Sequence, residues 1–190
     1  ATLTPTRRPT RTPGPTATPT ATTLVDVLTA TYGATATPTP TRTPAPTPPA
    51  QWVSGGTPSP LQIDEVAYAG SDGEYVVLAN VSGANLPLGG WTLGDAAQPG
   101  DGEGMYALPD LLLAPNGLFV VARQADAFRI LYGRRPDAAF ESAGDGVPLL
   151  VRRKDLAKGK LALNDSGDEI VLLTPDLLLA DAVAFGKGEY

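Results

Sequence analysis

Clustered carboxylates are the first residues in this sequence whose types and spacing suggest chemistry. They form two groups: Asp64, Glu65, Asp72 and Glu74, and then Asp95, Asp101 and Glu103. Carboxylate oxygens bind hard cations, and paired carboxylates can hydrolyse glycosidic bonds. Neither group has the ligand spacing of a calcium loop, and a small β-domain offers no evident substrate cleft. We therefore interpret both groups as solvated turns and predict no metal, cofactor-binding or catalytic residues.

The absence of two residue types narrows the chemistry further. The sequence contains no Cys and no His. This excludes disulfides, Cys/His zinc sites, thiol nucleophiles and Ser-His-Asp triads. We predict that the protein is not an enzyme and that it needs no cofactor.

Threonine hydroxyls are the remaining candidates for modification, and they gather in an N-terminal arm, residues 1–60. This arm holds 13 of the 20 prolines, and 19 of its residues are Thr. Such density resembles a mucin-like stalk that carries O-linked sugar, although a bare spacer has the same composition. The candidate acceptors flank the prolines: Thr10, Thr12, Thr16, Thr18, Thr39, Thr41, Thr43 and Thr47.

The arm contains a duplicated block, because PTRTPGPT at 9–16 and PTRTPAPT at 40–47 differ at one position. Dense proline removes backbone donors and biases its neighbours toward extended conformations. We therefore expect an extended, polyproline-like chain in both blocks.

A segment without Pro or Gly, residues 23–32, lies between the two blocks. Its β-branched residues recur at alternate positions, which favours a strand. A lone strand between stiff linkers must pair with a sheet edge of a neighbouring molecule or of its own domain, unless it stays disordered. The candidate subunit contacts in it are Leu24, Val25, Val27, Leu28 and Tyr32.

The charge of the chain is unevenly distributed. The arm carries Arg7, Arg8, Arg11 and Arg42 against a single acid, Asp26, whereas residues 61–190 carry 10 Lys/Arg against 19 Asp/Glu. An acidic domain repels nucleic acid. The four arginines are candidate contacts to an acidic neighbouring copy, although the same charges also serve solubility.

Residues 61–190 change to short apolar runs that are separated by turn residues. We predict an antiparallel β-sandwich with one short helix, at Ala125–Leu131. The expected strands are Leu61–Ala69, Glu74–Val81, Trp91–Leu93, Met105–Leu108, Leu118–Arg123, Leu161–Leu163, Glu169–Thr174 and Leu178–Phe185.

Several motifs in this domain resemble, in the correct order, those of the lamin tail domain family. They are IDEV at 63–66, GEYVVLAN at 73–80, LGGWTL at 88–93, LP at 108–109 with LAPNG at 113–117, LNDSGDEIVL at 163–172 and DAVAFG at 181–186. The resemblance implies an immunoglobulin-like sandwich that acts as an interaction module and that also occurs in exported bacterial proteins. The side chains of Asn80, Asn164 and Asp168 are expected to bond backbone groups at strand ends and in turns.

Two functions remain open at this point. In the first, the chain is a structural subunit of an extracellular or cell-surface filament or sheath, a homopolymer in which the arm adds a strand to a neighbouring subunit. In the second, it is a stalked binding or adhesion module that recognises a glycan or protein. The small first residue, Ala1, agrees with export and removal of a signal peptide, and no apolar stretch approaches the length of a membrane span.

Overall fold

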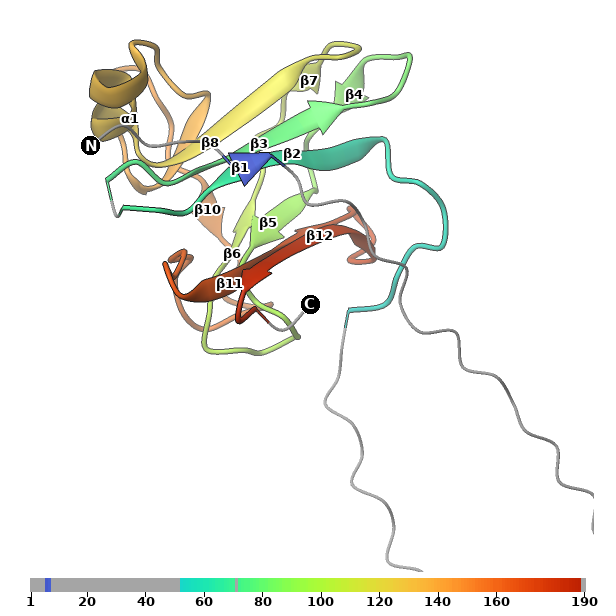
Figure 1. Ribbon diagram of the computed structural model, residues 1–190. Helices are drawn as coiled ribbons and strands as arrows, with labels where there is room; N and C mark the ends of the chain where they lie inside the picture. Colours follow the sequence, from blue (N-terminus) through green and yellow to red (C-terminus); the bar gives the residue numbers. More distant parts are fainter. Residues whose placement is uncertain (1–5, 8–51, 71, 189–190) are drawn as a thin grey trace, which may run out of the picture. The chain divides into compact units, whose positions relative to one another are not determined.

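The computed structural model describes residues 6–7, 52–70 and 72–188, and the labels below follow Figure 1. The described elements are β1 (Thr6–Arg7), β2 (Leu61–Ala67), β3 (Tyr75–Asn80), β4 (Leu86–Pro87), β5 (Thr92–Gly94), β6 (Met105–Ala107), β7 (Leu112–Leu113), β8 (Leu118–Gln124), α1 (Ala125–Tyr132), β9 (Ala138–Ser142), β10 (Val151–Arg152), β11 (Gly167–Leu173) and β12 (Leu179–Gly186).

Two five-stranded sheets form the layers of a β-sandwich (Figure 1). Sheet A has the order β1-β2-β3-β8-β9, and sheet B has the order β10-β6-β5-β11-β12. A short additional sheet pairs β4 with β7. The predicted immunoglobulin-like β-sandwich is therefore confirmed.

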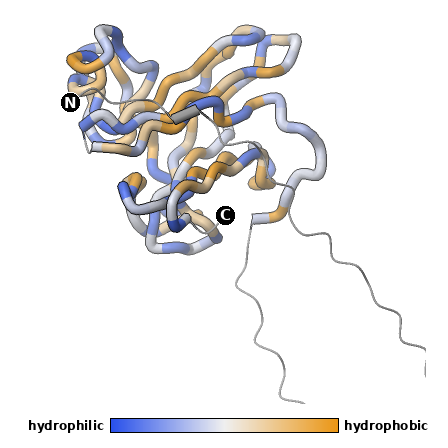
Figure 2. Tube along the Cα trace, in the orientation of Figure 1, coloured by the Kyte–Doolittle hydropathy of each residue, from blue (hydrophilic) through white to orange (hydrophobic). Residues whose placement is uncertain are grey.

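The core lies between the two sheets, and the strands that enclose it are largely hydrophobic (Figure 2). Alternate residues of each strand point inward, as the period of a β-strand requires. The inner face of sheet A contributes Leu61, Ile63, Val66, Val76, Leu78, Phe119 and Val121, and that of sheet B contributes Leu93, Tyr106, Ile170, Leu172 and Val183.

The central strands β3 and β11 are buried on both faces, so each contains a continuous apolar run, residues 75–79 in β3 and 170–173 in β11, instead of an alternating pattern. Helix α1 covers the outer face of β3, where Phe128 packs edge-on against Tyr75 with ring centroids 5.3 Å apart. The helix ends at Gly133, whose φ of 70° is a left-handed conformation that glycine adopts readily.

Packing begins before the first strand of the sandwich. Trp52 is buried against the outer face of sheet B, and its indole N–H donates to the carbonyl of Ala96 at 2.8 Å. The predicted boundary at Leu61 therefore marks the first strand of the sandwich, while the packed region extends to Trp52.

One prediction about the strands was wrong. Leu161–Leu163 does not form a strand, because the backbone N–H of Ala162 donates to the side chain of Asp95 at 2.8 Å. One pair of strands within the antiparallel sandwich runs in parallel. Helix α1 connects β8 to β9, and these two strands pair in parallel. A helical crossover of this kind returns the chain in the same direction.

Candidate functional site

The outer edge of β2 is the place where residues 6–7 of the arm pair with the sandwich. Strand β1 pairs with β2 in antiparallel register, with Thr6 opposite Val66 and Arg7 opposite Glu65. Strand β2 pairs with β3 on its other side, so β1 occupies what would otherwise be an edge of sheet A. An edge strand presents unpaired backbone groups that accept an added strand.

A β-bulge limits how far an added strand can run along β2. The register of β2 against β3 shifts between Ile63 and Glu65, which leaves the exposed Asp64 unpaired. Bulges interrupt the ladder and twist the edge. The pairing with β1 lies on the side of the bulge that contains Glu65 and Val66.

The other side of the bulge is closed by a side chain from sheet B. The backbone N–H of Ile63 donates to Oδ2 of Asp181 in β12 at 3.1 Å, and Asp181 is buried. The carboxylate thus takes a donor that an added strand would need. The β2 edge therefore has one half that is closed by Asp181 and one half that accepts a strand.

Acidic side chains surround the open half. Glu65, the register partner of Arg7, accepts a hydrogen bond of 2.6 Å from the Tyr75 hydroxyl, which holds its carboxylate in place. Burial, followed by this hydrogen bond, raises the pKa of Tyr75 above its ordinary value, so the phenol remains a donor. Asp64 and Glu65 give this edge a negative charge that suits a basic segment.

The structure separates the first predicted carboxylate group. Glu65 bonds Tyr75, whereas Glu74 is buried and forms an ion pair of 3.1 Å with Arg123. Asp72 accepts a hydrogen bond from Gln124 at 3.3 Å. These side chains do not converge on a shared position, because each one is held by a different neighbour.

The second predicted group is partly brought together. Glu103 lies beside Asp168 and Glu169, and one carboxylate oxygen from each lies within 4.8 Å of the others. Asp101 and Lys187 also line this hollow, whose volume is about 340 Å³. Asp168 and Glu169, contributed by β11 from a distant part of the sequence, were not predicted as members of this acidic group, although Asp168 was expected to bond backbone groups in a turn.

Protonation reduces the repulsion in this acidic hollow. Burial, and then the charges of Asp95, Glu169, Asp101 and Asp168, raise the pKa of Glu103 to about 8. Glu103 therefore retains its proton at neutral pH. Three carboxylates offer oxygen ligands to a hard cation, but a proton on Glu103 removes one of the charges that would hold it.

Asp95 has a structural role beneath the hollow. Its two carboxylate oxygens accept the backbone N–H groups of Gly104 at 2.6 Å and Ala162 at 2.8 Å. Burial raises the pKa of Asp95 to about 7, and these hydrogen bonds oppose the increase. The side chain connects sheet B to the segment that was predicted as a strand.

The predicted contact and modification residues of the arm lie almost entirely outside the described residues. Arg7 is the exception, as part of β1. The others outside the described residues are Arg8, Arg11, Arg42, Leu24, Val25, Val27, Leu28 and Tyr32, together with the threonines Thr10, Thr12, Thr16, Thr18, Thr39, Thr41, Thr43 and Thr47. Pairing by residues 6–7 was not predicted, since two residues beside proline carry no strand signal.

Comparison with known proteins agrees with this architecture. Residues 55–187 match the family described as the Lamin Tail Domain, which is an immunoglobulin-like structural domain and not a known enzyme family. No curated protein matches the sequence. Among the described residues, no helix is long and apolar enough to cross a membrane.

Proposed function

Because the chain belongs to the lamin tail domain family, we propose that it is a structural subunit of an extracellular or cell-surface filament or sheath. In this proposal the N-terminal arm of one copy adds a strand to sheet A of the next copy. The polymer is then held by backbone pairing at β2 and by attraction between a basic arm and an acidic domain.

The observation that carries the proposal is the pairing of β1 with the β2 edge. Thr6 and Arg7 belong to the arm in sequence, yet they take register positions opposite Val66 and Glu65. Strand addition obtains its affinity from main-chain hydrogen bonds, so a segment without large apolar side chains is able to dock. The same edge can receive the arm of a neighbouring copy.

A second extended segment pairs with an edge strand at the other layer. Leu179 of β12 accepts a hydrogen bond from the N–H of Gly55 at 3.1 Å and donates one to the carbonyl of Val53 at 2.7 Å. Residues 53–55, which precede β2, thus form backbone hydrogen bonds with β12 of the kind that join neighbouring strands. The segment that precedes β2 therefore contacts sheet B through these backbone bonds as well as through the side chain of Trp52.

The length and composition of the arm favour docking on a neighbour. Proline-rich chains extend by about 3.1 Å per residue, so a long proline-rich spacer can reach well beyond its own domain. The arm places more than forty residues, most of them in proline-rich blocks, between Arg7 and Trp52. We propose that this spacer carries the docking strand to the next copy, and that residues 23–32 supply a second strand for the same assembly.

Charge gives the docking a direction. The arm contains four arginines and one acidic residue, whereas the domain contains more acidic than basic residues. In the observed register Arg7 is opposite Glu65. Complementary charge speeds association and suppresses incorrect pairings, and salt screens it. We therefore expect assembly to weaken as the salt concentration increases.

Glycosylation is a further part of the proposal. O-linked sugars on the threonines of the two proline-rich blocks would stiffen the spacer and protect it from proteases. Intact-mass measurement of the protein purified from its source tests this directly. Masses above the sequence mass in steps of a sugar residue support it, and a single mass equal to the sequence mass contradicts it.

Size-exclusion chromatography with negative-stain imaging tests the assembly. The intact chain is compared with a chain that begins at Gln51. This shorter chain lacks residues 1–50 of the arm but keeps Trp52. We expect concentration-dependent polymers from the intact chain and monomers from the shorter chain. Monomers from both at high concentration would contradict the proposal, as would equal polymers from both.

A further inference from the structure

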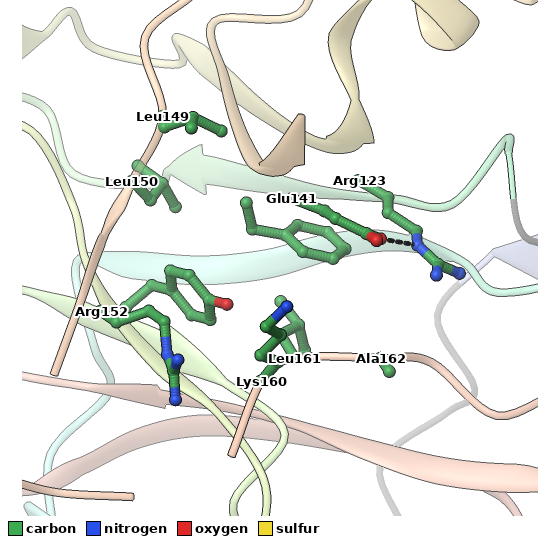
Figure 3. Close-up of a pocket in the computed structure, with 10 residues that line it drawn as sticks. Arg123, Glu141, Leu149, Leu150, Arg152, Lys160, Leu161 and Ala162 are labelled. Carbon is green, nitrogen blue, oxygen red and sulfur yellow. Dashed lines mark hydrogen bonds and ion pairs between the residues drawn. The ribbon is translucent and has the colours of Figure 1, made fainter. Parts of the chain in front are cut away.

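The two sheets separate on the side of the sandwich that lies away from β2 and β12. Strand β9 ends sheet A on this side, and β10 ends sheet B. A cavity of about 290 Å³ lies between them, lined by residues of β6, β8, β9 and β10 and of the segments directly before and after β10 (Figure 3). Neither the family resemblance nor the docking of the arm involves this cavity.

Two cations of the cavity have no acidic partner within the described part of the chain. The Arg152 guanidinium donates to the backbone carbonyls of Lys158, at 2.9 Å, and of Gly159. These carbonyls position the group but do not neutralise it. Lys160 follows Gly159 directly, is exposed, and forms no ion pair with any residue of 52–70 or 72–188.

The opposite wall carries one arginine that is paired with two carboxylates. Arg123 forms an ion pair with Glu141, which also lines the cavity (Figure 3), and a second ion pair with the buried Glu74. The cavity therefore has a positive end at Arg152 and Lys160 and a polar end at Arg123 and Glu141. A ligand with a single negative charge suits this arrangement, because a second charge would meet Glu141.

The remaining lining is mainly apolar. Tyr106 and Phe140 contribute nearly buried rings whose centroids are 6.3 Å apart, and Leu161 is also buried. Leu149 remains 47% exposed at the same cavity. A concave apolar surface with a few polar groups is the usual form of a small-molecule site.

We infer that this cavity binds a small organic monoanion whose carboxylate lies between Arg152 and Lys160 and whose apolar body lies against Leu149. The chemistry is that of a peptide C-terminus with an apolar side chain. A polyanion is disfavoured, since the surrounding domain is strongly acidic. The size of the cavity limits the ligand to about one amino-acid residue or one ring.

Saturation-transfer NMR, observed on the ligand, tests the inference on the intact chain and remains usable if the chain polymerises. The probes are N-acetylphenylalanine and its uncharged carboxamide. We expect saturable transfer to the acid and little to the carboxamide. Lys160→Gln should weaken binding on the order of tenfold, since it removes a charge-assisted contact. Lys154→Gln, a neighbouring exposed lysine outside the cavity lining, should leave binding unchanged.

Three results would overturn the inference. The first is equal transfer to the acid and the carboxamide, which would make the charge irrelevant. The second is unchanged binding in the Lys160→Gln chain. The third is tighter binding of glucuronate than of N-acetylphenylalanine, which would contradict the apolar assignment. None of these results depends on whether the arm assembles the chain into polymers.

Discussion

The backbone N–H of Ile63 donates to Oδ2 of Asp181 at 3.1 Å, across 118 residues of sequence. This bond connects β2 of sheet A to β12 of sheet B, where the sandwich is closed. It also occupies a donor on the outer edge of β2. The carboxylate of Asp181 therefore stabilises the domain and restricts where another strand can pair.

Replacement of Asp181 tests the first of these roles. Asp181→Ala leaves the buried N–H of Ile63 without its acceptor, at a cost of about 1–3 kcal/mol in the free energy of unfolding. Asp181→Asn should cost less, because the amide retains one acceptor oxygen. Urea unfolding of the chain that begins at Gln51 measures both. Asp176→Ala, at an exposed position, is the control and should stay within about 0.5 kcal/mol of the unsubstituted chain.

If the Asp181→Ala chain is as stable as the Asp176→Ala chain, the hydrogen bond between Ile63 and Asp181 does not stabilise the domain.

The raised pKa of Asp95 predicts how stability depends on pH. The folded domain holds the proton up to about pH 7, whereas the unfolded chain releases it near its ordinary pKa of 3.8. The folded state thus binds more protons between these values, and its stability falls as pH rises through this range. Glu103, with a pKa near 8, acts in the same direction.

Urea midpoints at pH 5 and pH 8 measure this dependence. We expect a lower midpoint at pH 8. The Asp95→Asn chain is the comparison. It should be less stable at both pH values, because the amide group cannot accept both backbone N–H bonds, and its midpoint should change less with pH. Stability that increases from pH 5 to pH 8 would contradict the assigned pKa shifts.

Proline substitutions identify the part of the arm that pairs. Thr6→Pro removes a backbone donor from β1, and Val27→Pro does the same in the predicted strand 23–32. We expect Thr6→Pro to reduce the sedimented, polymeric fraction severalfold, and Val27→Pro to reduce it if residues 23–32 supply the second strand. Thr47→Pro, within a proline-rich block, is the matched control and should have no effect. Unchanged polymer in both test chains would exclude strand addition.

The central strands of the two sheets were predicted well from the sequence, since a run of apolar residues is a local pattern. The apolar runs at 74–81 and 169–174 correspond to the central strands β3 and β11. The predicted role of Asn80 is confirmed: its side-chain amide donates to the carbonyls of Ala84, Leu113 and Ala114 at 2.8–2.9 Å. A turn motif of this kind is recognisable because its residues are chemically specific.

The edges of the sheets could not be predicted in the same way. Strands β4, β7 and β10 have two residues each, too few for a periodic pattern. Leu161 and Leu163 alternate as a strand does and are buried, yet Asp95 takes the intervening N–H. Likewise, Asp181 belongs to a recognised motif, but its partner Ile63 follows only from the folded arrangement. Long-range bonds of this kind leave no local signal.

Disulfide trapping between copies tests the central claim of arm exchange most directly. Arg7 and Glu65 are register partners, and the natural sequence has no Cys. Chains with Arg7→Cys and Glu65→Cys are therefore mixed in equal amounts and oxidised. Each chain alone, and Arg7→Cys mixed with Val151→Cys, serve as controls, since Val151 is 70% exposed on sheet B.

We predict a covalent heterodimer on non-reducing electrophoresis, at a yield well above every control. The double variant, with both cysteines in one chain, should then form crosslinked multimers. The contradictory result is no heterodimer above the controls, together with a double variant that crosslinks only within its own chain. The arm would then pair with its own domain, and the proposed polymer would lose its basis.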